Sequence, residues 1–206
     1  ATGFLLFGIA MVYGDTGSVS LTDIAAASKA GIGTQPILAL GVVLFLIGMG
    51  FKIAAVPFHL WAPDVYEGAP TPVTGFMAVG VKAAAFAGLL RAVVVGFSAD
   101  TAGDTVVPFL TALAYLTIIV GNILAVVQRN VKRMLAYSSV SHAGYAMIGV
   151  VAAAKGEASA GPAVLYYLLA YTFTTLGAFG VLTFLERKDS GAEAERFGAF
   201  AGVGFR

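Results

Sequence analysis

Lys82 is the residue of this chain whose position most demands a chemical explanation. It lies near the middle of the apolar segment 71–97, where its four-carbon stem does not readily reach either membrane surface. A lysine at the centre of a bilayer costs roughly 2.5–3.5 kcal/mol on insertion scales. Burial favours the neutral amine, so a nearby charge can move its proton on or off. This position predicts a proton or ion pathway, with a structural ion pair to another chain as the alternative.

A second lysine, Lys52, lies in the apolar segment 36–58, five residues before Pro57. Proline lacks an N–H, and its ring crowds the carbonyl four residues earlier, so the helix should break just after Lys52. Transporters use broken membrane helices to form ion sites, where protein or water satisfies the freed carbonyls. We therefore predict an ion site beside a broken helix, with snorkelling of Lys52 to the cytoplasmic surface as the alternative.

The two histidines of the chain are candidate proton relays, because an ordinary histidine titrates close to neutral pH. His59 directly follows the predicted break, and His142 opens the apolar segment 137–154. A lone histidine is more often simply hydrogen-bonded, so this alternative stays open for both. Two separated histidines without a nearby cysteine or carboxylate cluster make a poor metal site, and no metal is predicted.

Other polar residues have simpler explanations. Arg91 lies nine residues after Lys82, on the opposite helix face and nearer the outer surface, so snorkelling explains it better than chemistry. Asp64 and Glu67 fall in a short loop, where helix capping is expected. The tyrosines and threonines of segment 161–185 can bond one helix to another or line a wet path.

The composition is that of a membrane protein. Of 206 residues, 59% are hydrophobic and only 11% are charged, and the mean hydropathy is +0.90. An ordinary soluble domain carries about 25% charged residues. The net charge of +1 gives no basic footprint for nucleic acid. The absence of cysteine excludes disulfides, thiolate metal sites and iron–sulfur ligation by this chain.

The chain is expected to form one membrane domain over residues 1–206, an all-α polytopic helix bundle of about six helices with one broken helix near Lys52–Pro57. Its apolar segments are 1–13, 36–58, 71–97, 106–128, 137–154 and 161–185. Two of them, 106–128 and 161–185, contain no charged residue, the strong form of the spanning-helix signal. The first segment is too short to span, so the chain is expected to be an internal piece of a longer protein.

Basic residues suggest how the bundle is oriented. Cytoplasmic loops are enriched in lysine and arginine, and the densest basic cluster of the chain is 129–133. Placing that cluster inside also puts 59–70 and 186–196 inside, together with Arg187, Lys188 and Arg196. Loops 14–35, 98–105 and 155–160 then fall outside.

Two longer motifs carry a family resemblance. Residues 51–74 read FKIAAVPFHLWAPDVYEGAPTPVT, and residues 130–142 read NVKRMLAYSSVSH. Both resemble signatures of the antiporter-like membrane subunits of respiratory complex I, the NADH:quinone oxidoreductase. The part at 65–70 resembles the N-type subunits more than their paralogues. The similarity extends over essentially the whole chain.

The resemblance implies a proton-translocating bundle built from inverted repeats, each with a broken helix. Lys52 matches the lysine of the first broken helix, and Lys82 the central lysine of the helix after it. His59 and His142 match positions in the motif after the break and in a later helix. The membrane glutamate that pairs with the first lysine would precede this chain, and the second broken helix with its lysine would follow it.

The resemblance also implies partners and a location. The chain would be a non-redox subunit of a proton-translocating enzyme, beside other complex I membrane subunits, including its paralogues, in the lipid bilayer of a bacterial inner (plasma) membrane. NADH, FMN, iron–sulfur clusters and quinone would belong to other parts of the complex, leaving no cofactor in this chain. The alternatives are a related Mrp-type cation/proton antiporter subunit without redox partners, and a purely structural membrane spacer.

Overall fold

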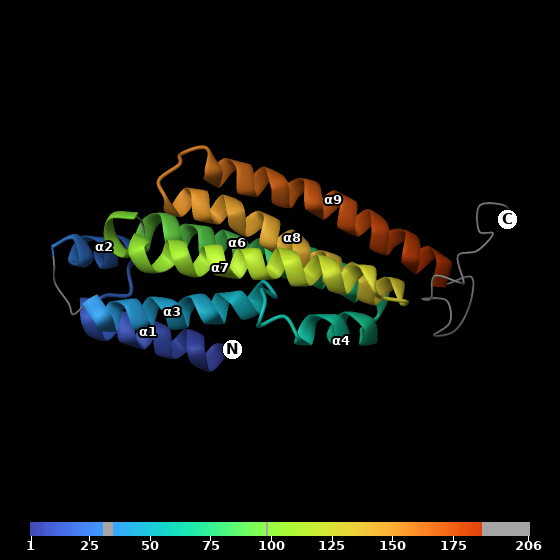
Figure 1. The fold of residues 1–206 in the computed structure, drawn as a ribbon, viewed down its shortest axis with the longest axis horizontal. Helices are drawn as coiled ribbons and strands as arrows, with labels where there is room; N and C mark the ends of the chain where they lie inside the picture. Colours follow the sequence, from blue (N-terminus) through green and yellow to red (C-terminus); the bar gives the residue numbers. More distant parts are fainter. Residues whose placement is uncertain (31–34, 98, 187–206) are drawn as a thin grey trace.

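The computed structural model describes residues 1–30, 35–97 and 99–186, whose regular elements are all helices. The long helices lie roughly along one direction (Figure 1). This confirms the predicted all-α bundle. The elements are α1 (Thr2–Thr16), α2 (Leu21–Lys29), α3 (Gln35–Lys52), α4 (Trp61–Gly68), α5 (Thr71–Phe76), η1 (Met77–Val81), α6 (Lys82–Arg91), η2 (Ala92–Gly96), α7 (Ala99–Val126), α8 (Val131–Ala154) and α9 (Ala160–Glu186).

Fewer helices have the length and composition of a membrane span than the six apolar segments suggest. Within the described ranges, three stretches qualify: Thr71–Gly96, Asp100–Val126 and Ala160–Leu185. The pair α1 and α2 qualifies only together and is bent by 49°, while α3 is a shorter apolar helix. The 24-residue helix α8 is long enough, but its serines and His142 make it more polar. Helices α7 and α8 begin at Ala99 and Val131, before the apolar segments 106–128 and 137–154. The first turns of both helices contain polar residues, which a hydropathy pattern does not assign to a span.

The break predicted near Lys52–Pro57 is confirmed. Helix α3 ends at Lys52, and helical structure resumes only at Trp61 with α4. Between them Ala54 has a φ of 58°, in the left-handed region that residues with a Cβ rarely adopt. The Val56–Pro57 peptide bond is cis. The chain therefore leaves its helical path over a short buried stretch rather than bending gently.

Neighbouring helices satisfy backbone groups that the break leaves free. The indole Nε1 of Trp61 donates to the carbonyl oxygen of Phe51 at 3.1 Å, across the break. The backbone N–H of Val56 donates to Thr117 Oγ1 on α7 at 3.0 Å, and that hydroxyl donates to the carbonyl of Leu113 at 2.5 Å. Such pairing is required where irregular backbone lies at membrane depth.

The stretch that carries Lys82 is one continuous helix, as expected for segment 71–97, but it is not uniformly α-helical. It contains two π-helical turns, η1 immediately before Lys82 and η2 near its outer end. π-helical turns inside α-helices are frequent at functional sites. Here the first of them ends at Val81, directly before Lys82, which is the first residue of α6.

Loops expected on opposite sides of the membrane lie at opposite ends of the bundle (Figure 1). The α4 segment and the α7–α8 connection lie at one end, and α2 with the α8–α9 connection lies at the other. This agrees with the predicted alternation of loops, although which end is cytoplasmic stays a prediction. Arg187, Lys188 and Arg196 lie outside the described residues.

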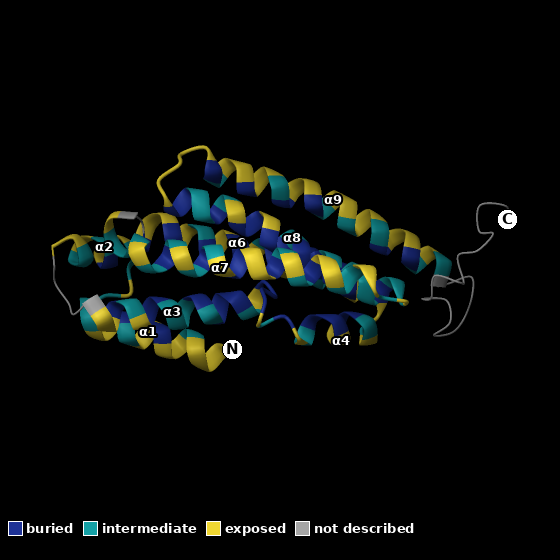
Figure 2. Cartoon of the chain, in the orientation of Figure 1, coloured by how far each residue is buried: buried dark blue, intermediate teal, exposed yellow. Residues whose placement is uncertain are grey.

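The core and the outer faces are both apolar. The main buried cluster includes Val42, Leu46, Val93, Val106 and Met147, and it joins α3, η2, α7 and α8. In Figure 2, exposed positions run along the outer sides of α1, α7 and α9. On α9 these include large apolar side chains such as Phe173 and Phe184, which are 71% and 69% exposed. Faces of this kind suit contact with lipid or with further membrane helices rather than water.

Candidate functional site

Lys82 is buried inside the bundle, as its position in the sequence predicts. Only 3% of its surface is exposed. Its amine, Nζ, donates to the backbone carbonyl of Ser139 on α8 and also contacts the Ser139 hydroxyl. No carboxylate of residues 1–30, 35–97 and 99–186 forms an ion pair with it. Among the described residues, this amine therefore has neutral acceptors and no carboxylate partner.

His142 lies beside the same space, one turn further along α8 than Ser139. Its Nδ1 is 2.6 Å from the hydroxyl of Tyr167 on α9, and its ring centroid is 5.0 Å from that of Tyr171. Together with Lys82, Phe86, Ala143 and Leu168, these side chains line one cavity. The cavity is too narrow in this conformation to admit a water molecule. Lys82 and His142, which lie 60 residues apart in the sequence, are thus brought to a single site.

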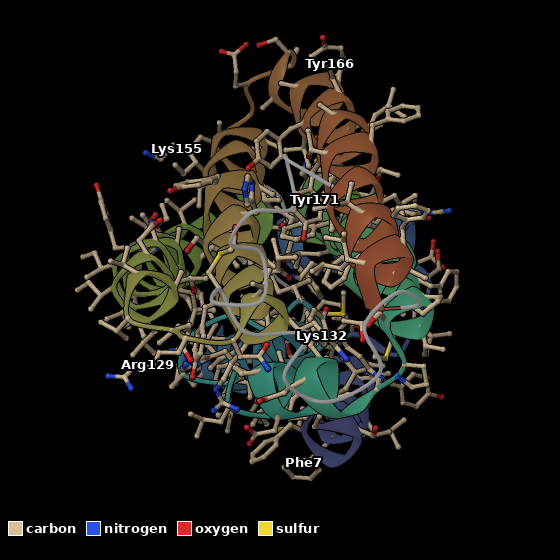
Figure 3. The ribbon with its side chains drawn as sticks, turned by 90° about the vertical axis from the view of Figure 1, so that its right-hand side faces the viewer. Phe7, Arg129, Lys132, Lys155, Tyr166 and Tyr171 are labelled. Atoms are coloured by element: carbon tan, nitrogen blue, oxygen red, sulfur yellow. The ribbon has the colours of Figure 1, made fainter. Side chains whose placement is uncertain are left out.

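Tyr171 adds an unusual polar group to this site. It projects between α8 and α9 (Figure 3), and only 7% of its surface is exposed. Its hydroxyl lies near Ser139 and Thr175 but makes no hydrogen bond of acceptable geometry within the described part of the chain. Buried polar groups are almost always hydrogen-bonded to protein or water, so this hydroxyl marks a place where water would be stabilised.

Of the other members of this site, the sequence indicates Tyr167 and Tyr171 only within the tyrosines and threonines of segment 161–185 that can line a wet path, and it does not single out Ser139. The spacing of four residues between the two tyrosines places both on one helix face, and that was an available signal. Ser139 gave no comparable signal, because serines are common in membrane helices where they bond other helices.

His59 is buried but lies apart from this cavity. It is 5% exposed, its ring centroid is 6.4 Å from that of Tyr137, and neither ring nitrogen has a hydrogen-bond partner among the described residues. It is not among the residues that line the cavity at Lys82. A buried imidazole of this kind calls for a water or a further polar partner.

Lys52 is not brought together with Lys82. It is exposed at the last residue of α3, where the break begins. This exposure also fits the snorkelling alternative, so a role for Lys52 in an ion site stays a prediction. Arg91 is exposed at the end of α6, as snorkelling predicts.

Asp64 and Glu67 do not cap a helix, contrary to the expectation from their loop position. Helix α4 begins after Leu60 without a side-chain cap, and both carboxylates instead bind Arg133 at 2.7 and 2.8 Å. The sequence could not show this, because the partner lies 69 and 66 residues away. Across the ranges described, no group of three or more His, Cys, Asp or Glu residues could hold a metal ion.

Comparison with known proteins shows what this chain is similar to. The model of the family described as NADH:quinone oxidoreductase/Mrp antiporter, TM, matches residues 1–201. The NADH-quinone oxidoreductase subunit N of Beutenbergia cavernae is 48% identical over 210 residues, covering 100% of this chain and 39% of that protein. The chain therefore spans about two fifths of the length of such relatives.

Solved structures share the fold. A chain of respiratory complex I from Thermus thermophilus, determined with bound aureothin, is 40% identical with a TM-score of 0.72, over 91% of this chain and 41% of that chain. A chain of the Mrp complex from Dietzia sp. DQ12-45-1b is 25% identical with a TM-score of 0.75, over 89% and 33%. The two folds match about equally well, and sequence identity is what separates them.

Proposed function

Because this chain belongs to the family of NADH:quinone oxidoreductase and Mrp antiporter membrane subunits, we propose that it is the central part of subunit N of a bacterial NADH:quinone oxidoreductase. In that role it translocates protons across the inner membrane, as one multi-pass domain assembled with other membrane subunits of the complex. The higher identity to subunit N relatives and to a complex I chain favours this over an Mrp-type antiporter, because the matching chain of the Dietzia sp. Mrp complex is only 25% identical.

One observation carries the proposal: Lys82 is buried against neutral acceptors in a cavity that it shares with His142. An ammonium group without a nearby carboxylate is poorly stabilised in a low-dielectric interior, so its protonation depends on charges placed around it. Purely structural lysines are normally paired. The pair Lys82 and His142 instead supplies one group that can release a proton and another that can accept it.

The transfer itself follows from the hydrogen-bonding groups present. Lys82 Nζ in its ammonium form gives up a proton and becomes a neutral amine, and the proton moves by way of hydroxyl groups or entering water to the imidazole of His142. The hydrogen bond between Tyr167 and His142 Nδ1 holds the ring so that its other nitrogen can exchange protons. Since the cavity is closed to water in this conformation, transfer requires a wetter state in which α8 and α9 separate slightly.

The driving charge would come from the region of the break. A change in the pairing of Lys52 with a carboxylate alters the electrostatic potential at Lys82, and this moves the proton of Lys82. His59, buried after the break with neither ring nitrogen hydrogen-bonded to another described residue, is the candidate for proton exchange on that side. Redox chemistry takes place elsewhere in the complex, and this cysteine-free chain contributes no cluster ligand.

The proposal is tested by Lys82→Ala in the intact complex, reconstituted in vesicles. We expect proton transfer through this subunit to slow by about a hundredfold or more, as is typical when a proton-transferring group is removed. Protons translocated per NADH oxidised should then fall. Lys155→Ala is the matched control, because Lys155 is an exposed lysine in the α8–α9 connection (Figure 3).

Each alternative gives a different result. A structural spacer predicts that Lys82→Ala impairs assembly but leaves the proton yield of assembled complexes unchanged. An Mrp-type antiporter predicts that the protein purifies without flavin- and iron–sulfur-containing subunits. Full proton yield in assembled Lys82→Ala complexes would overturn the proposed role.

A further inference from the structure

A charged contact lies away from Lys82, at the end of the bundle where α4 lies. Arg133, in the first turn of α8, contacts two carboxylates of α4 through the same nitrogen. Its Nη1 is 2.7 Å from Asp64 Oδ1 and 2.8 Å from Glu67 Oε2. Asp64 and Glu67 are three residues apart, so they lie on one face of α4 and converge on a single partner.

Two neighbours of Arg133 strengthen this contact. Asn130 caps α8 by accepting the N–H of Arg133 at 3.1 Å, and its amide donates to Glu67 Oε1 at 3.2 Å. Lys132, which is 3% exposed, donates to the carbonyl oxygen of Ala69 at the end of α4 at 2.9 Å. Contacts from the N-cap and first turn of α8, made by Asn130, Lys132 and Arg133, therefore fix the orientation of α4 against the start of α8. We call Arg133, Asp64 and Glu67 the ion-pair clamp.

The clamped helix is tied to the break at its other end. Trp61, the first residue of α4, donates to the carbonyl of Phe51, and the two rings stack at 5.5 Å. Tyr66 is 1% exposed and packs with Ala136 of α8 in a small apolar cluster. Helix α4 thus joins two places: the broken end of α3 and the first turns of α8.

Helix α8 leads from the clamp directly to the buried site. Ser139 and His142 follow Arg133 by six and nine residues, so they lie about 9 Å and about 14 Å further along one helix at 1.5 Å per residue. Within the clamp, Glu67 is 37% exposed and Asp64 is 72% exposed, so Glu67 is the more sheltered partner. The hydrogen bonds to Glu67 and then to Asp64 also raise the pKa of Arg133, which keeps it charged throughout the physiological range.

Stability does not explain this arrangement, because ion pairs as exposed as that of Asp64 and Arg133 contribute little to folding. Orientation does, since one guanidinium nitrogen that contacts two carboxylates on one face of a short helix restrains both the rotation of α4 and its distance from α8. We propose that Arg133 is a positioning residue whose clamp on Asp64 and Glu67 couples the segment beyond the helix break to α8, which presents Ser139 to Lys82. A rearrangement at the break is then transmitted to the acceptor of the buried lysine.

The effect on proton transfer rests on the proposed function, but the mechanical coupling can be measured separately. The variant is Arg133→Gln in the intact complex, with Arg129→Gln as the matched control. Arg129 is an exposed arginine of the same connection that points away from the bundle (Figure 3) and has no ion pair within the described residues. Hydrogen exchange of backbone amides in 53–69 reports on the coupling, and protons translocated per NADH report on its consequence.

We expect amides of 53–69 to exchange at least about threefold faster in Arg133→Gln, because a restraint on local opening is lost. They should exchange normally in Arg129→Gln and in Arg133→Lys, which keeps the charge. The proton yield should fall in Arg133→Gln while NADH oxidation continues. If Arg133→Gln fails to assemble, the double variant Arg133→Glu with Glu67→Arg serves instead, and it should restore slow exchange that either single change removes.

The outcomes separate this proposal from the one before it. Normal exchange in Arg133→Gln overturns the clamp, whatever the proton yield. Faster exchange with a full proton yield, in complexes where Lys82→Ala pumps poorly, overturns the coupling and leaves the role of Lys82 standing. A full proton yield in Lys82→Ala itself overturns the proposed function, while faster exchange in Arg133→Gln would still support the clamp as a mechanical restraint.

Discussion

At the scale of single residues, the main feature is that the buried amine of Lys82 has neutral hydrogen-bond acceptors and no carboxylate partner among the described residues. Its described contacts are with the carbonyl and hydroxyl of Ser139, and none is with a carboxylate. This distinguishes it from Arg133, which is shared between two carboxylates at the end of the bundle. The first arrangement suits a group that changes its protonation state, and the second suits a group that stays charged and holds position.

Tyr167→Phe tests the hydrogen bond that orients His142. Removing the hydroxyl leaves Nδ1 without its partner at 2.6 Å, so the ring loses its fixed orientation. One hydrogen bond is worth about 1 kcal/mol, so we expect proton transfer to slow by up to about tenfold while NADH oxidation continues. Proton yield in vesicles is the measurement.

The control for this variant is Tyr166→Phe, one residue earlier on α9. Tyr166 is 75% exposed and points away from the bundle (Figure 3), so its hydroxyl should be dispensable. Equal proton yields in the two variants would contradict a role for the bond between Tyr167 and His142.

The positions of some of these residues could be predicted from the sequence, and those of others could not. The burial of Lys82 was predictable, because the side chain of a lysine at the centre of an apolar segment does not readily reach either membrane surface. The neighbours of His142 were not, because Tyr167 and Tyr171 approach from another helix and nothing local specifies which face of α9 turns inward. The same limit explains Asp64 and Glu67: their local pattern suggested capping, and only the fold places Arg133 between them.

At the scale of helices, the break and the close approach of α7 to α8 set the positions of the site residues. Pro57 made the break predictable, since its ring cannot be accommodated in a continuous helix. The left-handed Ala54 within it was not predictable, because such a backbone depends on pairing with distant groups such as Thr117. The place of a helix break can thus be predicted from the local sequence, whereas the backbone conformation within the break cannot.

Gly121→Ala tests the contact between α7 and α8. A Cβ at Gly121 would lie 2.8 Å from the backbone nitrogen of Ser141, so the two helices would have to separate. Overpacking of this kind costs about 1–3 kcal/mol, and we expect lower thermal stability of the intact complex. The shift should also displace α8 and therefore reduce proton yield.

Gly177→Ala is the matched control on α9, because a Cβ there meets nothing within 4 Å. It should leave stability unchanged or raise it slightly, since alanine favours helix over glycine. If both glycine variants behaved alike, close packing of α7 on α8 would not be what positions Ser139.

At the scale of the whole molecule, the chain is a bundle whose two ends have different roles. Helix α4, which carries the carboxylates of the clamp, lies at one end, and α2 with the α8–α9 connection lies at the other (Figure 1). Composition and hydropathy predicted a membrane bundle, because both are summed over many residues. The number of spans is harder to predict from such sums, since three stretches of the described residues qualify singly by length and composition and the bent pair of α1 and α2 qualifies only together.

The central claim is that Lys82 releases and regains a proton during turnover. Infrared difference spectroscopy of the intact complex, with ¹⁵N-labelled lysine, tests it most directly by comparing resting and turning-over states. We expect an isotope-sensitive band of amine deprotonation that disappears in Lys82→Gln and persists in Lys155→Gln. The same band in Lys82→Gln as in the unaltered complex would show that the proton is carried elsewhere and would contradict the account.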